Sequence, residues 1–426
     1  MLWSSGAVAF GILSLLPVEL ILQVGSGAGY AMVFALLIAA IIWNLGTWWL
    51  GLPASSSHTM IGSIIGVGVA NALLRGRDGA SGVDWGQATT VGEALLLSPI
   101  VGFVCSALLL YVMKLVVRKP ELYTAPKDNK PPALWIRGLL VLTCTGVSFF
   151  HGSNDGQKGM GLIMLILIGV VPTTYALNRS MDESAVAGFM RASDDTAKII
   201  QSKVAGFQEI GDPDPRQSLT SFVRDKASFT DGTYLALGKV VKSISDEIKT
   251  SGTLAKVPTA AVNNTRNDMY LVSEALRNLP KVQDNQLSAD EAKSIAAYKA
   301  GLDKSTKFIP TWVKVAVAIA LGLGTMIGWK RIVVTVGEKI GKDHLTYGQG
   351  AAAELVAMGT IFAADNFGLP VSTTHVLSSG VAGTMAANGS GIQWETLRSI
   401  ALAWVLTLPC AALLSGVLYL GFHAIF

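Results

Sequence analysis

Long apolar segments, separated by short polar ones, run through most of the 426-residue chain. A membrane-spanning helix needs about 20 mostly apolar residues. By that measure the pattern predicts spanning helices over 7–24, 28–50, 89–113, 309–329, 347–364 and 396–424, and a broken one over 138–150 with 159–177. We therefore expect an all-α polytopic membrane protein.

Two other apolar segments, 51–75 and 368–388, are interrupted by the same motif. GLPASSSHT at 51–59 returns as GLPVSTTHV at 368–376. Gly-Leu-Pro interrupts a helix because proline has no N–H and glycine tolerates unusual dihedral angles. We interpret both segments as re-entrant or hairpin elements. Broken apolar segments in corresponding halves of a membrane protein point to a transporter's binding site.

The hydroxyl residues of the two motifs are candidate ligands of an oxyanion. Each helix N-terminus carries roughly half a positive charge and free N–H groups, so two that meet can bind an anion without an arginine. The alternative is that these hydroxyls only cap their helices. The candidates are Ser55, Ser56, Ser57, Thr59, Ser372, Thr373 and Thr374.

A polar cluster, HGSNDGQK at 151–158, stands in the middle of an apolar stretch. Ionisable residues at membrane depth cost about 2.5–3.5 kcal/mol each on insertion scales, and usually line a pathway or pair with one another. Asn154, Asp155 and Gln157 offer oxygen ligands to a small cation or a proton, and Asp155 is the expected coupling group. The alternatives are a buried structural pair of Asp155 with Lys158, or a hydrated loop.

Several other ionisable residues in apolar segments have two interpretations. Glu354 is either a second coupling group or a tie between helices. His58 and His375 hold equivalent positions in the two motifs, as packing residues or as proton-sensitive hydrogen-bond partners. Further carboxylates in or near apolar segments are Glu19, Glu93 and Asp365.

Composition agrees with a membrane protein. Hydrophobic residues make up 51% of the chain and charged residues 15%, whereas a soluble domain carries about 25% charged residues. The net charge of +4 gives no reason to expect nucleic-acid binding. No nucleophile–base pair, metal-ligand spacing or ATP-binding motif is present, so we expect neither an enzyme nor a cofactor. The driving force should then be an ion gradient, of H⁺ or Na⁺.

The segment 178–308 differs in character from the rest. From Arg179 to Lys307 it holds 18 basic and 17 acidic residues, so it is nearly neutral. Apolar residues recur at helical spacing in 184–204, 234–250 and 289–302. We expect a mostly helical soluble insert. It contains no cysteine and no histidine, so we expect no second active site there.

The motifs resemble those of the inorganic phosphate transporter (PiT) family, in its bacterial low-affinity, proton-coupled branch. The resemblance covers about 1–177 and 309–426, and includes GTWW at 46–49 and TMIGW at 325–329. It implies two inverted repeats with phosphate bound between them at the hydroxyls named above, and cation or proton coupling at Asn154 and Asp155. It also implies a multi-pass symporter of the inner membrane.

On that basis the chain divides into five parts. These are the remainder of the first membrane repeat (1–113), a basic cytoplasmic loop (114–137), the start of the second repeat (138–177), the insert (178–308) and the rest of the second repeat (309–426). The expected partners are inorganic phosphate, alone or as a divalent metal–phosphate complex, the lipid bilayer and a second copy of the chain.

One departure from the family concerns the N-terminal region. In the family, the first repeat opens with a helix whose motif is like that at 151–155, well before the first Gly-Leu-Pro. The residues that precede Gly51 contain no such motif. We therefore expect a chain that lacks this first helix, and with it half of the family's cation site.

Two other functions fit parts of the pattern. Hydroxyls and helix ends bind tetrahedral oxyanions in general, so a carrier of sulfate or arsenate is one alternative. The size of the insert suggests the other, a membrane receptor or assembly protein that works through 178–308.

The loop charges predict the orientation. Loops 114–137 and 330–342 are rich in Lys and Arg, so both should be cytoplasmic, and segment 138–177 should cross once and place the insert outside. A cysteine introduced near residue 230 should react with an impermeant thiol reagent added outside intact cells, and one near residue 125 should not. The reverse labelling would show that 138–177 crosses twice.

Overall fold

The computed structural model describes residues 6–16, 18–126, 131–205, 213–282, 285 and 287–426. Helices form nearly all of its regular structure, and this described part contains no strand beyond one isolated bridge between Gly341 and Ile392. Contacts divide the chain into two compact units. A membrane unit comprises Met1–Leu16, Ala31–Ile163 and Pro310–Phe426, and an insert unit comprises Pro17–Tyr30 and Met164–Ile309.

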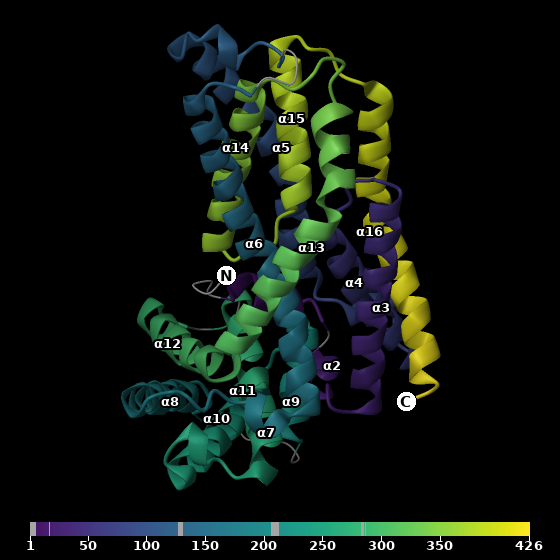
Figure 1. Cartoon of the computed structure of the whole chain (residues 1–426). Coiled ribbons are helices and arrows are strands. Elements are labelled where there is room, and N and C mark those ends of the chain that lie inside the picture. The colour runs from purple at the N-terminus through teal and green to yellow at the C-terminus, as the bar shows by residue number, and fades with distance from the viewer. Residues whose placement is uncertain (1–5, 17, 127–130, 206–212, 283–284, 286) are drawn as a thin grey trace. The chain divides into compact units, whose positions relative to one another are not determined.

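Six of the described helices are long and apolar enough to cross a membrane, which confirms the predicted all-α polytopic fold. They are α3 (Gly27–Trp49), α4 (Ser56–Leu74), α5 (Trp85–Val116), α6 (Leu134–Val170), α13 (Thr311–Glu338) and α16 (Trp394–His423). The membrane unit also contains α1 (Ala7–Leu13), α14 (Tyr347–Asn366) and α15 (Thr373–Asn388), and short 3-10 turns at Gly79–Gly82 and Pro120–Leu122. Figure 1 shows the order of these elements.

Both Gly-Leu-Pro motifs interrupt the helical structure, as predicted. Gly51 and Gly368 adopt positive φ angles of 69° and 65°, which glycine reaches without the steric penalty of a Cβ. The first break separates α3 from α4, and the second separates α14 from α15. The re-entrant position of these segments in a bilayer stays a prediction.

Each helix that follows a break packs closely on a long helix from the other half of the chain. α4 lies along α16, and α15 lies along α5 (Figure 1). Glycines allow the approach: a Cβ on Gly66 would lie 1.9 Å from the carbonyl oxygen of Ala412, and one on Gly383 would lie 2.1 Å from that of Phe103. Small residues at helix interfaces are typical of membrane bundles, because they let the backbones come together.

Two predicted spans are wrong, and a third, 347–364, corresponds to α14, which is not among the six helices above. Residues 7–24 form two short helices, α1 and α2 (Val18–Leu22), instead of one spanning helix. Pro17 lies between them in the sequence and has no N–H to continue a helix. The predicted break within 138–177 is also absent, since α6 runs unbroken from Leu134 to Val170. Interior glycines cost a helix only about 1 kcal/mol each, and the polar side chains find partners on neighbouring helices.

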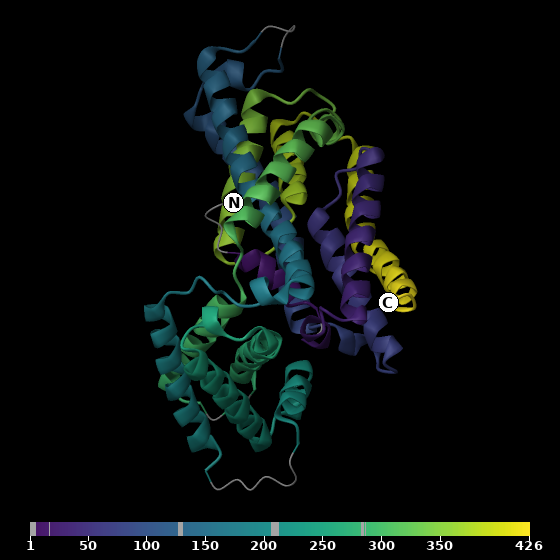
Figure 2. The same ribbon diagram turned by 60° about the horizontal axis from the view of Figure 1, so that its bottom comes forward.

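The insert is helical, as predicted. Its helices are α7 (Pro172–Tyr175), α8 (Glu183–Lys203), α9 (Pro215–Arg224), α10 (Asp231–Ser251), α11 (Thr259–Asn278) and α12 (Ala289–Thr306). Short 3-10 turns lie at Lys226–Ser228, Leu254–Lys256 and Leu279–Lys281. The predicted segments 184–204, 234–250 and 289–302 correspond to α8, α10 and α12, whereas α9 and α11 were not predicted. Figure 2 shows these helices, in teal and green, around a common centre.

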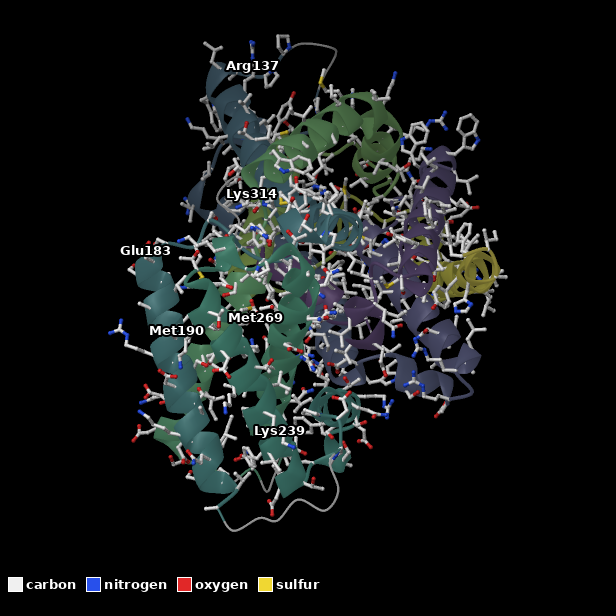
Figure 3. The ribbon with its side chains drawn as sticks, turned by 90° about the horizontal axis from the view of Figure 1, so that it is seen from below. Arg137, Glu183, Met190, Lys239, Met269 and Lys314 are labelled. Carbon is white, nitrogen blue, oxygen red and sulfur yellow. The ribbon has the colours of Figure 1, made fainter. Side chains whose placement is uncertain are left out.

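The centre of the insert is apolar, with a few buried polar groups. Met269, labelled in Figure 3, is fully buried, and Phe189 stacks on Tyr298 with ring centroids 5.3 Å apart. Arg266 is also buried, and burial lowers its pKa to about 10. Its Nη1 donates to the carbonyl oxygen of Ile21 at 3.1 Å, which ties α11 to α2 within this unit.

One methyl group added at the α4–α16 interface should lower the stability of the protein. Gly66→Ala should destabilise the purified protein by about 1–3 kcal/mol, because overpacking forces the two backbones apart. Gly92→Ala is the matched control, since a Cβ there meets no atom within 4 Å. Thermal unfolding in detergent measures both. Equal melting temperatures for the two variants would contradict this account of the packing.

Candidate functional site

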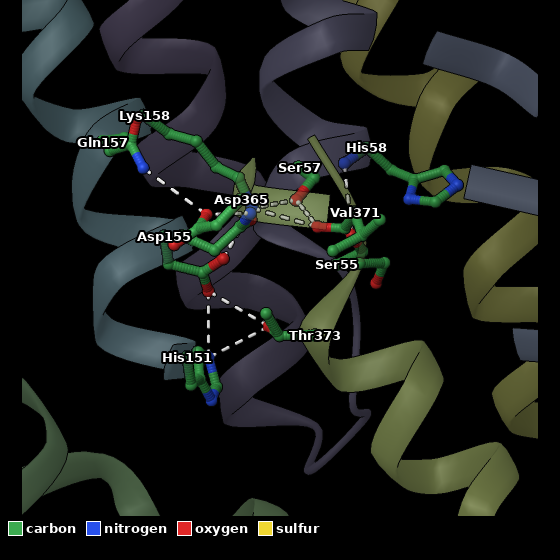
Figure 4. A network of polar contacts seen from close by, with 12 residues as sticks. Ser55, Ser57, His58, His151, Asp155, Gln157, Lys158, Asp365, Val371 and Thr373 are labelled. Carbon is green, nitrogen blue, oxygen red and sulfur yellow. Dashed lines mark hydrogen bonds and ion pairs between the residues drawn. The ribbon is translucent and has the colours of Figure 1, made fainter. Parts of the chain in front are cut away.

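Most of the predicted polar residues lie together in the membrane unit, where α6 passes the two breaks. α6 contributes the cluster at 151–158, α14 contributes its C-terminal end, and α4 and α15 contribute their N-termini. Figure 4 shows the network that joins these elements. None of the described part holds a group of three or more His, Cys, Asp or Glu side chains arranged to bind a metal ion.

The first hydroxyl of each motif caps its helix. Ser55 Oγ accepts a hydrogen bond from the backbone N–H of His58, and Ser372 Oγ accepts one from that of His375, both at 3.2 Å. These two residues therefore match the capping alternative. Thr59 is also turned away from the others, since its hydroxyl lies 3.1 Å from Asn44 Oδ1 on α3.

The two helix N-termini lie next to each other. Ser57 Oγ of α4 donates to the carbonyl oxygen of Val371, just before α15, at 3.0 Å. The rings of His58 and His375 lie with their centroids 4.6 Å apart, and His375 stacks on Trp404 at 4.0 Å. The two histidines thus act as packing residues between the motifs, which is one of the two roles predicted for them.

Several donors at these N-termini have no partner among the described residues. They are the backbone N–H groups of Ser56, Ser57, Thr373 and Thr374 and the hydroxyls of Ser56 and Thr374. The first N–H groups of a helix always lack an intrahelical acceptor, and the helix dipole adds positive potential at the same place. Two adjacent termini with open donors can bind an oxyanion.

Three side chains contact the carboxylate of Asp155. Its Oδ1 accepts from Lys158 Nζ at 2.5 Å, and its Oδ2 lies 2.9 Å from His151 Nε2 and 3.2 Å from Thr373 Oγ1. His151, Asp155 and Lys158 are three and four residues apart, so they share one face of α6. The pair of Asp155 with Lys158, expected only as an alternative, is therefore present.

Lys158 is almost completely buried, with 2% of its side chain exposed. Besides Asp155, its ammonium donates to Ser57 Oγ at 2.5 Å and to the carbonyl oxygen of Val371 at 3.1 Å. One side chain of α6 thereby reaches both α4 and the break before α15 (Figure 4).

A second carboxylate, Asp365, completes the site from the end of α14. Its oxygens accept from Ser153 Oγ at 2.7 Å, Asn154 Nδ2 at 2.8 Å and Gln157 Nε2 at 3.4 Å. All three donors are neutral, and no Lys, Arg or His of the described residues forms an ion pair with Asp365. The buried Asn154 Oδ1 also has no hydrogen-bond partner within that part of the chain.

Glu354 lies apart from this network. It accepts a hydrogen bond from Thr143 Oγ1 at 2.5 Å. Glu354 also stands three turns before Asp365 on α14, which is about 16 Å along a helix axis. The structure therefore brings Asn154, Asp155 and Gln157 together, but not Glu354.

Sequence reasoning did not assign Asp365 and Lys158 to the site. Asp365 was noted only as a carboxylate near an apolar segment, although it stands three residues before the second Gly-Leu-Pro. Its position at the end of the helix that the motif interrupts is a signal that could have identified it. The sequence analysis includes Lys158 only in the alternative interpretation, as the partner of Asp155 in a buried structural pair.

Comparison with known proteins gives consistent matches over nearly the whole chain. A family profile described as "Phosphate transporter family" matches residues 3–415. The low-affinity inorganic phosphate transporter PitA of Escherichia coli (strain K12) is 38% identical over 97% of this chain and 85% of its own. PitB of the same strain is also 38% identical over the same shares.

Two further matches are more distant. The probable low-affinity inorganic phosphate transporter of Bacillus subtilis (strain 168) is 28% identical over 93% of this chain and 76% of its own. A solved structure described as the sodium-dependent phosphate transporter aligns with 99% of this chain and 88% of its own, at 18% identity and a TM-score of 0.44.

Proposed function

The chain belongs to the phosphate transporter family, and from that premise we propose that it carries inorganic phosphate across the inner membrane, driven by an ion gradient. The resemblance that the motifs suggested is thereby confirmed at the level of the family. This is a family of carriers and not of enzymes. It also disfavours a receptor that works through the insert.

The open donors at the two helix N-termini are the observation that carries the proposal. Four backbone N–H groups and the hydroxyls of Ser56 and Thr374 offer hydrogen bonds to a tetrahedral oxyanion. Such donors, reinforced by the helix dipoles, bind phosphate without a guanidinium. They also let it leave again more readily than a bidentate Arg fork would. Transport of phosphate with a divalent metal stays a prediction, as does the second copy of the chain.

We place the coupling ion, expected to be a proton, at Asp365 in preference to Asp155. The negative charge of Asp155 is already balanced by Lys158. Among the described residues Asp365 has only neutral donors, two of which are the expected coupling residues Asn154 and Gln157. A partly buried carboxylate without a cation is unfavourable, so a proton or a small cation would be bound there. The free Asn154 Oδ1 offers such a cation a further oxygen.

The first prediction concerns phosphate affinity. Ser56→Ala and Thr374→Val should each raise the KM for phosphate by about tenfold to a hundredfold, because a hydrogen bond to a charged group is worth about 1.5–3 kcal/mol. Thr59→Val is the matched control, since that hydroxyl of the same motif points to Asn44. Radiolabelled phosphate uptake into transport-deficient cells gives the KM, and competition by sulfate and arsenate gives the selectivity.

An unchanged KM in both variants would remove these hydroxyls from the binding site. A wild-type protein for which sulfate competes better than phosphate would be a carrier of another oxyanion, and the phosphate assignment would be wrong.

The second prediction separates the two carboxylates. Asp365→Asn should abolish gradient-driven net uptake in proteoliposomes but preserve phosphate–phosphate exchange, because the substrate donors are intact and the coupling charge is gone. Asp155→Asn leaves the ammonium of Lys158 buried without its anion, and should destabilise the protein by about 3–5 kcal/mol. Uptake under an imposed pH or Na⁺ gradient, exchange and thermal unfolding distinguish the two effects.

The opposite pattern would move coupling back to Asp155. That pattern is an Asp365→Asn variant with normal gradient-driven uptake, and a stable Asp155→Asn variant that exchanges phosphate but accumulates none.

A further inference from the structure

The buried ammonium of Lys158 occupies a compact cage of oxygens. Its three acceptors are a carboxylate (Asp155), a hydroxyl (Ser57) and a backbone carbonyl (Val371), at 2.5, 2.5 and 3.1 Å. We propose that this cage is a binding site for a small monovalent cation, such as Na⁺, and that the ammonium of Lys158 is its permanent occupant. The proposal deepens the proposed function, since it bears on which ion drives transport.

The hydrogen-bond geometry at Lys158 is complete. An ammonium has three N–H donors and no acceptor, and each donor here has one partner. Ser57 can accept this bond because its own proton is donated to Val371. Asp155 can accept it because its other oxygen faces His151 and Thr373. No donor of Lys158 is left for a substrate.

The chemistry of the cage is that of a cation site. Hard oxygen ligands are those that small hard cations prefer. In transporters with broken helices, backbone carbonyls of the unwound segment coordinate Na⁺, and Val371 belongs to the segment between α14 and α15. The ammonium of lysine is a compact point charge, unlike the planar guanidinium of arginine, so it fills such a cage as an ion would.

A tethered cation has a consequence for transport. A bound Na⁺ can enter and leave with the substrate, whereas Lys158 remains attached to α6. The cage then supplies constant positive charge between α6, α4 and the second break but cannot use a Na⁺ gradient. Coupling must lie elsewhere, and Asp365 is the carboxylate of the site that has no cationic partner among the described residues.

The alternative is that Lys158 binds phosphate directly. Its burial and its three existing bonds oppose this, because a substrate would have to displace at least one of the acceptors Asp155, Ser57 and Val371. Removal of Lys158 separates the two roles. It should create a Na⁺ site if the ammonium replaces an ion, and it should only weaken phosphate binding if the ammonium is a ligand.

The test compares K158M with the wild type and with K114M. Lys114 on α5 donates to Asn388 Oδ1, away from the site, so K114M is the same chemical change elsewhere. In purified full-length protein, K158M should bind one more radiolabelled Na⁺ per chain than the wild type. Its melting temperature should rise with NaCl relative to N-methylglucamine chloride of equal ionic strength. K114M should resemble the wild type in both measurements.

The double variant D155N/K158M should lose the additional Na⁺, because the carboxylate of the cage is gone. K158Q, whose amide can still donate to Asp155, is measured alongside in case the methionine variant is poorly recovered. A folded K158M or K158Q that binds no more Na⁺ than the wild type would overturn the proposal. Lost phosphate binding without gained Na⁺ would make Lys158 a phosphate ligand.

These measurements count Na⁺ and do not require phosphate transport. A wild type that fails to transport phosphate would therefore contradict the proposed function and leave the test of the cage intact.

Discussion

A lysine ammonium inside an apolar bundle needs an anion and an acceptor for every N–H, and in this protein that requirement joins separate elements. The ammonium of Lys158 on α6 donates to the carboxylate of Asp155 on the same helix. Its other acceptors are Ser57 of α4 and the carbonyl oxygen of Val371, beside α15. Burying the two charges is unfavourable by itself, and loss of either partner costs about 3–5 kcal/mol. The pair therefore fixes the positions of the two helix N-termini relative to α6 more than it adds stability.

The remaining features of the site follow from that arrangement. With the first hydroxyl of each motif used as a cap and Lys158 fixed between the motifs, the adjacent N-termini keep open donors for an anion. The continuous α6 also presents Ser153, Asn154 and Gln157 to Asp365. One carboxylate of the site is thus balanced by Lys158, whereas the other has only neutral partners within the described part of the chain. A carboxylate of that kind would suit the proposed reversible binding of a proton or cation.

Local chemistry in the sequence predicted much of this fold. Gly-Leu-Pro breaks a helix wherever it occurs, and the 3.6-residue periodicity of the insert requires no knowledge of its partners. The continuity of α6 could not be predicted in the same way. Whether a polar cluster breaks a helix depends on the hydrogen-bond donors and acceptors of distant residues, here Ser57 and Asp365. A single sequence does not show which distant residues pack beside the cluster. The partners of Asp365 could not be predicted for the same reason, because they lie more than 200 residues away in the sequence, on α6.

The two copies of the motif are similar in sequence but serve the site differently. Ser56 and Thr373 occupy equivalent positions, as do Ser57 and Thr374. In the first copy Ser57 binds Lys158 and leaves Ser56 open, whereas in the second copy Thr373 contacts Asp155 and leaves Thr374 open. Each motif therefore commits one hydroxyl to α6 and leaves one free. Because a single α6 serves both motifs, the two copies cannot make the same contacts, and one open hydroxyl on each helix would let both N-termini contribute to the proposed anion site.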